Sequence, residues 1–386
     1  MIPYGRQDIS EADIEVVMEV LRSDFLTQGP AVPAFESEVA TLSEAGRSVA
    51  FNSATSALHA ACLALGLEKG DRLWTTPNTF VASANCGLHC GAKVDFVDID
   101  PVTWNMSVTK LEEKLLDAKL NGTLPKIVVP VHFAGQPTEQ EKIFSLAKDY
   151  GFKILEDASH SIGASRNGEP VGSCRWSDIT VFSFHPVKIV TSGEGGMALT
   201  NDLELAECLR LIRSHGITRD ALLMESSNPA PWHYEQNLLG FNYRMTDIQA
   251  ALGLSQLRRL RVFLEKRNEL AQVYHNALAM LPLQLPEVTP GNFSAYHLYV
   301  VRLQLQHITQ THRQVFEELR HLGIGVNLHY MPVYMQPYYQ KLGFSLGICP
   351  EAERYAAEAI TLPLYPGLKQ EQQALIIQAL KAVLSQ

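Results

Sequence analysis

Short apolar runs alternate with longer amphipathic segments over the first 200 residues of the chain. The apolar runs favour buried strands, and the amphipathic segments favour helices. The expected strands are residues 48–51, 73–75, 94–97, 127–132, 152–155, 179–184 and 197–200. The expected helices include residues 54–65, 81–90 and 139–149. This alternation predicts an α/β fold with a large, mostly parallel sheet flanked by helices.

The pattern changes after about residue 220, and residues 226–231 are expected to form a loop. Thr246 then begins a helical stretch to about Met280, and Gln249 completes a capping-box pattern. The elements expected beyond it are a proline-rich linker at 281–292, a strand at 296–305, a helix at 311–321, a turn at 323–326 into another strand, and helices at about 351–360 and 369–384. We therefore expect a large domain, residues 1–280, and a smaller C-terminal α/β domain, residues 281–386.

Composition and charge exclude several classes of partner. The chain has 386 residues and a net charge of −9 with no run of basic residues, which argues against nucleic acid and anionic membranes. No apolar stretch reaches about 18 residues, and the N-terminus carries no signal segment, so a cytoplasmic protein is expected. The six scattered cysteines are expected to be free thiols. Cys86, His89 and Cys90 have helical spacing without a second ligand cluster, so no metal is expected.

One acid and one lysine follow neighbouring strands of the predicted sheet. Asp157 lies just after the strand at 152–155, and Lys188 lies in the glycine-rich loop after the strand at 179–184. The carboxyl ends of parallel strands form the usual ligand crevice. Pyridoxal phosphate (PLP) enzymes require such a pair, because the acid pairs with the pyridine nitrogen and the lysine forms a Schiff base. The sequence therefore predicts a PLP site.

Other polar residues near the strand ends each have two interpretations. Residues 52–57 open a helix whose backbone N–H groups suit a phosphate, although an ordinary N-capped helix has the same pattern. Ser183 could bind a phosphate or cap a strand, and Phe80 could lie on an aromatic ring or fill the core. His160 could bond a ring oxygen or only its neighbours. Their joint order along one sheet, together with the acid and the lysine, favours the functional interpretation.

Motifs along nearly the whole chain resemble the DegT-type nucleotide-sugar aminotransferases, which are PLP enzymes of the aspartate-aminotransferase fold (fold type I). The matching stretches are residues 24–30, 51–57, 156–160 (Glu-Asp-Ala-Ser-His), 183–188 (Ser-Phe-His-Pro-Val-Lys), 193–196 (Gly-Glu-Gly-Gly), 213–216, 240–245 and 329–332. Several such motifs in the right order are specific to the family. The resemblance implies an enzyme with PLP as its cofactor.

The resemblance also implies roles for individual residues at the cofactor. Lys188 matches the Schiff-base lysine, and Asp157 matches the partner of the pyridine nitrogen. His160 stands where a polar residue contacts the 3-oxygen of the ring, and Phe80 stands where an aromatic residue stacks on the ring. The residues implied at the phosphate are Thr55, Ser56, Ser183 and Asn242. Asn242 resembles an asparagine that reaches the phosphate of the other subunit, which implies a homodimer with shared active sites.

Within this family, the chain is most similar to the subgroup that forms UDP-4-amino-4,6-dideoxy-N-acetyl-β-L-altrosamine in pseudaminic acid synthesis. The likeness lies in residues 2–5, 23–29 and 327–332. It implies transfer of an amino group from glutamate to C4 of a UDP-4-keto-6-deoxy-N-acetylhexosamine. The implied substrate-binding residues are Tyr4, Asp24, Phe25, Leu26, Thr27, Ala54, His329, Tyr330, Met331 and Pro332.

Three alternatives remain open at this point. Another enzyme of the family could use a dTDP- or GDP-linked sugar, or could aminate C3. Known PLP dehydratases of the same fold carry histidine in place of the lysine, whereas this chain has Lys188. A regulatory protein without catalysis would be expected to lose the lysine or the acid, and both Lys188 and Asp157 are present.

Overall fold

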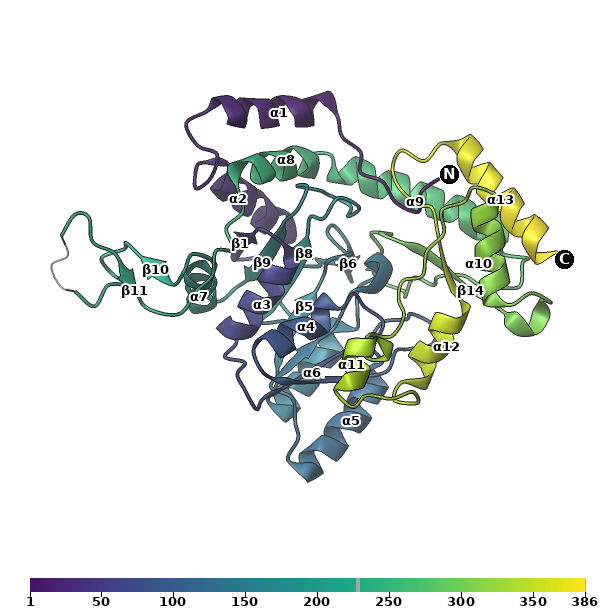
Figure 1. Ribbon diagram of the computed structural model, residues 1–386, viewed down its shortest axis with the longest axis horizontal. Coiled ribbons are helices and arrows are strands. Elements are labelled where there is room, and N and C mark those ends of the chain that lie inside the picture. The colour runs from purple at the N-terminus through teal and green to yellow at the C-terminus, as the bar shows by residue number, and fades with distance from the viewer. Residues whose placement is uncertain (227–229, 386) are drawn as a thin grey trace.

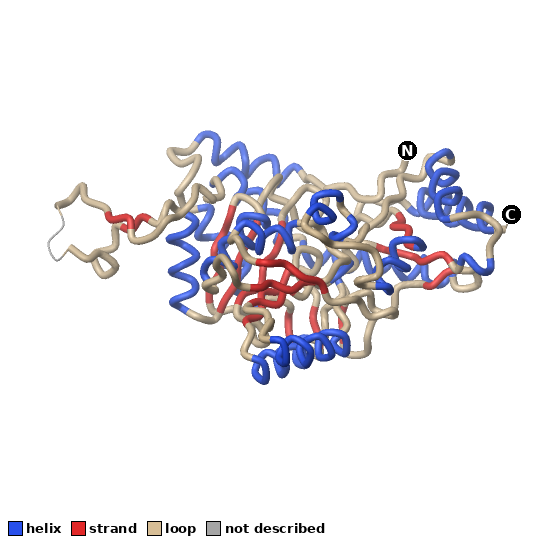
Figure 2. Tube along the Cα trace, turned by 60° about the horizontal axis from the view of Figure 1, so that its bottom comes forward, coloured by secondary structure: helices blue, strands red, loops and turns tan. Residues whose placement is uncertain are grey.

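The computed structural model describes residues 1–226 and 230–385 and is built around one seven-stranded sheet. The strands lie in the order β1–β9–β8–β5–β4–β2–β3 (Figures 1 and 2). Their bounds are β1 (Arg47–Phe51), β2 (Arg72–Thr75), β3 (Lys93–Phe96), β4 (Ile127–Val129), β5 (Lys153–Asp157), β8 (Ile179–Ser183) and β9 (Gly196–Thr200). Only β9 runs against its neighbours. The predicted α/β fold with a mostly parallel sheet is confirmed.

The strand predicted at 127–132 is shorter than expected. β4 ends at Val129, and Val131 makes only a single bridge to Asp157. Pro130 lies between them and has no N–H to continue the ladder. Its carbonyl instead accepts a hydrogen bond from the backbone N–H of Asp157 at 2.9 Å, which fixes the end of β5.

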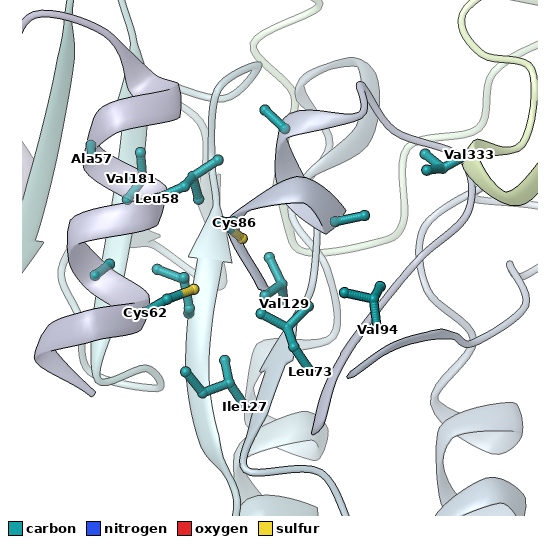
Figure 3. Close-up of a cluster of buried hydrophobic side chains, with 14 of the residues drawn as sticks. Ala57, Leu58, Cys62, Leu73, Cys86, Val94, Ile127, Val129, Val181 and Val333 are labelled. Atoms are coloured by element: carbon teal, nitrogen blue, oxygen red, sulfur yellow. The ribbon is translucent and has the colours of Figure 1, made fainter. Parts of the chain in front are cut away.

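Helices cover both faces of this sheet (Figure 2). They are α2 (Ala31–Ser43), α3 (Ala54–Ala64), α4 (Ala82–His89), α5 (Val108–Asn121), α6 (Gln140–Tyr150), α7 (Leu203–Arg213) and α8 (Asp247–Leu257), whereas α1 (Glu11–Arg22) packs on α8. Figure 3 shows Leu58 and Cys62 of α3 beside Ile127 of β4 and Val181 of β8, in one buried cluster. Burying a leucine of this kind contributes about 1.5–3 kcal/mol, so this packing holds the start of α3 against the sheet.

The helical stretch predicted from Thr246 to about Met280 is two helices, α8 and α9 (Leu260–Leu278). The predicted capping box is present, because Thr246 and Gln249 exchange hydrogen bonds at the start of α8. The break falls at Arg259, whose guanidinium donates to the carboxylates of Asp8 and Asp13 at 2.7 Å. This contact ties the N-terminal segment to α8 and α9, and the local sequence pattern does not reveal it.

The C-terminal part forms a smaller α/β unit with its own buried cluster. Its sheet has the antiparallel order β12–β14–β15. Its elements are β12 (Leu283–Gln284), β14 (Tyr299–Leu303), β15 (Ala359–Leu362), α10 (His312–His321), α11 (Pro337–Lys341), α12 (Pro350–Glu358) and α13 (Gln370–Leu384). The cluster also contains Leu270 and Tyr274 of α9. A domain boundary at residue 280 remains a prediction.

One expectation for the C-terminal part was wrong, and one strand was not predicted. The turn at 323–326 leads into no strand, and Ile324 and Asn327 make only single bridges, to Ile2 and Thr361. The helix predicted at 351–360 ends at Glu358, and β15 begins directly after it. A four-residue apolar run such as β15 cannot be assigned from periodicity alone, since its pairing with β14 is a long-range contact.

Short strands complete the chain. β6 (Ser165–Arg166), β7 (Glu169–Pro170) and β13 (Asn292–Phe293) form a small sheet, so the expected linker at 281–292 contains short strands. β10 (Ile217–Thr218) and β11 (Glu235–Gln236) form the base of an arm that extends from α7, away from the body of the molecule (Figure 1). Residues 226, 230 and 231 of the predicted loop lie between β10 and β11, and residues 227–229 of that prediction lie outside the described part of the chain.

Candidate active site

One large cavity opens at the carboxyl ends of β5 and β8 and has a volume of about 540 Å³. The predicted site residues that line it are Tyr4, Ala54, Thr55, Phe80, Asp157, His160, Ser183, Lys188, His329, Tyr330 and Met331. The predicted site residues outside its lining are Asp24, Phe25, Leu26, Thr27, Ser56, Asn242 and Pro332. The cavity therefore brings together the acid, the lysine and most of the other predicted residues.

Lys188 follows β8 in a turn, and its backbone N–H donates to the carbonyl of His185 at 2.9 Å. Burial of the amine among the cavity walls lowers the pKa of Lys188 to about 8, although the charge of Asp157 acts to raise it. A lysine with a pKa near 8 has a much larger neutral fraction at neutral pH than an exposed lysine. The neutral amine is the form that attacks a carbonyl.

Asp157 ends β5 and is buried beneath the cavity. Its carboxylate accepts hydrogen bonds from the hydroxyl of Ser83 at 2.6 Å and from the backbone N–H of Ser159 at 3.1 Å. These two donors fix the orientation of the carboxylate and leave it facing the cavity. Ser83 lies on α4, three residues after Phe80, and nothing in the sequence pattern marked it as a partner of the acid.

The start of α3 forms another wall. Ser53 is its N-cap and accepts from the backbone N–H of Ser56 at 3.1 Å. The hydroxyl of Ser56 is buried and donates to the side chain of Asn52, whereas Thr55 lines the cavity. β9 approaches this turn so closely that a Cβ at Gly196 would lie 2.5 Å from the backbone N of Ala54. Glycine at 196 is therefore required for the sheet to abut the helix N-terminus.

Three buried histidines share the opposite wall: His160, His297 and His329. Burial lowers the pKa of each, with a further contribution from the charge of Lys188, and the pKa of His329 falls to about 3. All three are therefore neutral near pH 7. His329 Nδ1 lies 2.9 Å from the hydroxyl of Thr361, and the rings of His160 and His297 lie 4.4 Å apart.

Several lining residues were missed by the sequence interpretation. They include Ser159, His185, Glu194, His297, Asn327 and Gln336. Asn327 lies inside a motif stretch, and Ser159 lies between two predicted site residues, so both could have been proposed from their position. His297 precedes β14 and Gln336 precedes α11, and only the tertiary fold brings these two side chains to the cavity.

The described part of the chain offers neither a membrane-spanning helix nor a metal site. Within residues 1–226 and 230–385, no helix is long and apolar enough to cross a membrane. In the same part of the chain, no group of three or more histidine, cysteine or acidic side chains is arranged to hold a metal ion. All six cysteines, including Cys86 and Cys90, are free.

Comparisons with known proteins find similar chains. A family model described as the DegT/DnrJ/EryC1/StrS aminotransferase family matches residues 7–381. A Campylobacter jejuni protein named UDP-4-amino-4,6-dideoxy-N-acetyl-beta-L-altrosamine transaminase is 38% identical over 343 residues, which cover 89% of this chain and 87% of that protein.

Solved structures match over the whole chain. Helicobacter pylori PseC, described as an aminotransferase involved in the biosynthesis of pseudoaminic acid, is 30% identical with a TM-score of 0.89, and the match covers 100% of this chain and 99% of that chain. Streptococcus pneumoniae Spr1654, described as a sugar aminotransferase and solved in a PMP form, is 30% identical with a TM-score of 0.90 and the same coverage. Spr1654 has also been solved in a PLP form.

Proposed function

Because the chain belongs to the DegT/DnrJ/EryC1/StrS aminotransferase family, we propose that it transfers the amino group of glutamate to C4 of a UDP-4-keto-6-deoxy-N-acetylhexosamine. The protein is a sugar aminotransferase, and PLP is its cofactor. One observation supports this proposed substrate most strongly. Residues of the acid–lysine pair and residues of the substrate-subgroup stretches line the same cavity.

The polar groups of the cavity fit PLP. The cofactor, once bound, supplies an electron sink that carries the amine between the two substrates. Asp157 would hold the pyridine nitrogen, since its carboxylate is buried and faces the cavity. Thr55 and Ser183 would bind the phosphate beside the N-terminus of α3, where the helix dipole favours an anion. Phe80 lines the same cavity with 58% of its surface exposed, which suits a side chain that a flat ring would cover.

We assign two tasks to Lys188: covalent attachment of the cofactor and proton transfer at the reacting carbon. A pKa of about 8 suits both tasks, because the amine is partly neutral near pH 7 and can accept or return a proton. The neighbouring histidines are held neutral with depressed pKa values. They are therefore poor bases, and proton transfer falls to Lys188.

The sugar nucleotide is proposed to occupy the part of the cavity formed by Tyr4, His329, Tyr330 and Met331. His329 and Tyr4 lie with ring centroids 5.1 Å apart, which joins the N-terminal segment to the C-terminal unit at this point. The segment 24–27 does not line the cavity of its own subunit, and Phe25 and Leu26 in it are exposed. We propose that this segment acts at the site of a second subunit.

A homodimer is proposed on the basis of exposed apolar surface. Ile14, Met18, Leu21 and Phe25 recur at helical spacing along α1 and just beyond it, and all four are exposed. Leu222, Trp232 and Leu239 on the arm are 91%, 80% and 81% exposed. Such surfaces usually mark an interface. Asn242 makes a single bridge to Ser214, just before β10, and is exposed, so we propose that it reaches the phosphate site of a partner subunit.

The substrate is tested by a panel of 4-keto and 3-keto nucleotide sugars with glutamate as the amine donor. The UDP-linked 4-keto-6-deoxy-N-acetylhexosamine with a β-L-arabino ring should be aminated at C4, with one 2-oxoglutarate formed per amine, as measured by NMR of the product. Lys188→Ala should give almost no product. Much faster amination of a dTDP- or GDP-linked sugar, or amination at C3, would refute this substrate and leave the family assignment intact.

A further inference from the structure

Three cysteines and two histidines gather where α3 packs on α4. Cys62 lies in the last turn of α3, Cys86 lies on α4, and Cys90 is the C-cap of α4. Cys62 and Cys86 belong to one buried cluster, against which Cys90 packs (Figure 3). His59 lies three residues before Cys62, and its ring centroid is 5.5 Å from that of His89. This thiol cluster lies outside the lining of the large cavity.

Cys62 connects the other two thiols. Its side chain is hydrogen-bonded to those of both Cys86 and Cys90. The thiol of Cys86 donates to the carbonyl of Ser83 at 3.3 Å, so its proton is directed to the backbone of its own helix. The proton of Cys62 is therefore the one that reaches the sulfur of Cys90.

Cys90 is the accessible thiol of the cluster and the acidic one. It is half-buried, whereas Cys62 and Cys86 are fully buried. The hydrogen bond from Cys62 holds the pKa of Cys90 well below its usual range, and a hydrogen bond from His59 acts in the same direction against the effect of burial. Burial raises the pKa of Cys62, so that sulfur keeps its proton. A thiolate at Cys90 thus lies directly beside a thiol at Cys62.

The second donor to Cys90 is held in place by its own contacts. The Nδ1 atom of His59 lies 3.1 Å from the hydroxyl of Tyr243, and the His59 ring packs edge-on against Phe241 with centroids 5.1 Å apart. His59 is itself buried. The polar surroundings of Cys90 are therefore fixed by the fold of two helices and the segment 241–243.

We propose that Cys90 is a site of reversible oxidation by peroxides, and that Cys62 resolves the oxidised sulfur into a disulfide. A partly exposed thiolate beside a second thiol is the arrangement that reacts with peroxide in this way. The proposed site lies apart from the cofactor cavity, and the proposal does not depend on the identity of the substrate.

The chemistry has two steps. The Cys90 thiolate attacks one oxygen of hydrogen peroxide, the O–O bond breaks, and hydroxide leaves and takes a proton from solvent. The sulfur of Cys62 then attacks the sulfenic sulfur of Cys90, and the S–O bond breaks as an S–S bond forms. The hydroxyl group leaves as water with the proton of Cys62. Peroxide gains two electrons, and the two cysteines lose one each.

The disulfide would join two helices that both serve the cofactor cavity. Thr55, at the start of α3, lines the cavity, and Ser83 on α4 donates to the carboxylate of Asp157. The bond would therefore fix α3 and α4 to each other behind the cofactor site.

The test is treatment of the wild-type holoenzyme with hydrogen peroxide at pH 7, followed by alkylation of the remaining thiols and mass spectrometry. Cys208 is the internal control, because it is also half-buried but burial raises its pKa. The Cys90 thiol should be lost about tenfold or more faster than that of Cys208, since an ordinary thiol is only a few per cent thiolate at this pH. The product should be a peptide pair joined through Cys62 and Cys90, and dithiothreitol should release it.

Three variants separate the two roles. In Cys62→Ser the hydroxyl still donates to Cys90 but cannot form a disulfide, so the sulfenic acid should persist and be trapped by dimedone at Cys90. Cys86→Ser and Cys208→Ser should form the disulfide as the wild type does. The wild-type measurement needs no substitution, so the proposal stays testable even if Cys62→Ser folds poorly.

Three results would overturn the proposal. One is loss of the Cys90 thiol no faster than that of Cys208, and another is a disulfide from Cys90 to a residue other than Cys62. The third is a wild-type protein in which Cys90 is oxidised without forming a disulfide. Each result is read from masses rather than turnover, so it is independent of whether the proposed sugar is the substrate.

Discussion

At the scale of single residues, two neighbouring carboxylates on β5 serve different purposes. Consecutive side chains on a strand point to opposite faces, so Glu156 and Asp157 diverge. Glu156 is buried and accepts hydrogen bonds from Gln140 at 2.6 Å and Thr180 at 2.7 Å. Asp157 instead faces the cavity. Only Asp157 is therefore placed to meet a ligand, although the sequence offers both acids side by side.

Asp157→Asn tests the role proposed for this acid. The amide keeps the size of the side chain but cannot hold the pyridine nitrogen protonated, so the electron sink weakens. We expect kcat to fall by about 100-fold or more, with PLP content and thermal unfolding close to wild type. Retention of half the activity would mean that Asp157 is only a structural loop acid.

The lowered pKa of Lys188 predicts how cofactor uptake depends on pH. Only the neutral amine attacks the aldehyde of PLP, and Lys188 loses its proton near pH 8 in the folded apoenzyme. The rate of PLP uptake by apoenzyme should therefore rise with pH and level off above about 8. A rate that still climbs near pH 10, as for an exposed lysine, would contradict the effect of burial on this amine.

At the scale of elements, the seven strands of the large sheet were predictable because each is a local apolar run, although Pro130 ends β4 early and the helices α1 and α2 were not predicted. The predicted strands at 179–184 and 152–155 were enough to bring Lys188 and Asp157 to one edge of the sheet. The errors lie where long-range pairing decides the structure. β15 exists because Ala359–Leu362 pairs with β14, and His297 reaches the cavity because the C-terminal unit packs there. Periodicity carries no information on either contact.

The start of α8 organises the segment proposed to bind the sugar nucleotide. Asp247 is buried, and its carboxylate accepts from the backbone N–H groups of Gly29 and Ala31, each at 2.8 Å. The backbone N–H of Asp247 donates to the carbonyl of Leu26 at 3.0 Å. One acid thus fixes the chain that leads from residue 26 into α2.

Asp247→Ala should loosen this segment. Two part-buried backbone N–H groups lose their acceptor, so we expect a loss of about 1–3 kcal/mol in the free energy of unfolding and faster hydrogen exchange at Gly29 and Ala31. KM for the nucleotide sugar should rise at least several-fold, with KM for glutamate unchanged. Glu204→Ala, at an exposed acid in the first turn of α7, is the control. Faster exchange without a change in KM would separate this segment from substrate binding.

At the scale of the whole molecule, the predicted site residues do not all line the cavity of one chain. The predicted residues Asn242 and 24–27 lie outside the cavity lining of their own subunit, while the arm and α1 expose apolar side chains. A twofold homodimer would resolve both features by building two identical composite sites. From the sequence, Asn242 was assigned to the phosphate site of the other subunit only because of the family resemblance.

Mixed dimers test this arrangement. Lys188→Ala and Asn242→Ala homodimers should each have weak activity. After unfolding and refolding together at equal concentrations, half of the dimers should be mixed, and each mixed dimer would carry one site with both changes and one with neither. Activity should recover to about a quarter of wild type, which follows from random pairing about a twofold axis. No recovery despite mixed dimers confirmed by mass spectrometry would mean that Asn242 serves its own subunit.

The central claim is that Lys188 carries the cofactor in this cavity. The most direct measurement is borohydride reduction of the PLP-loaded protein, followed by digestion and mass spectrometry. The account predicts that the reduced cofactor is found on Lys188 in the wild type, and that Lys188→Ala binds PLP without any covalent label while losing turnover by several orders of magnitude. A label on a different lysine, or full turnover by Lys188→Ala, would contradict the account.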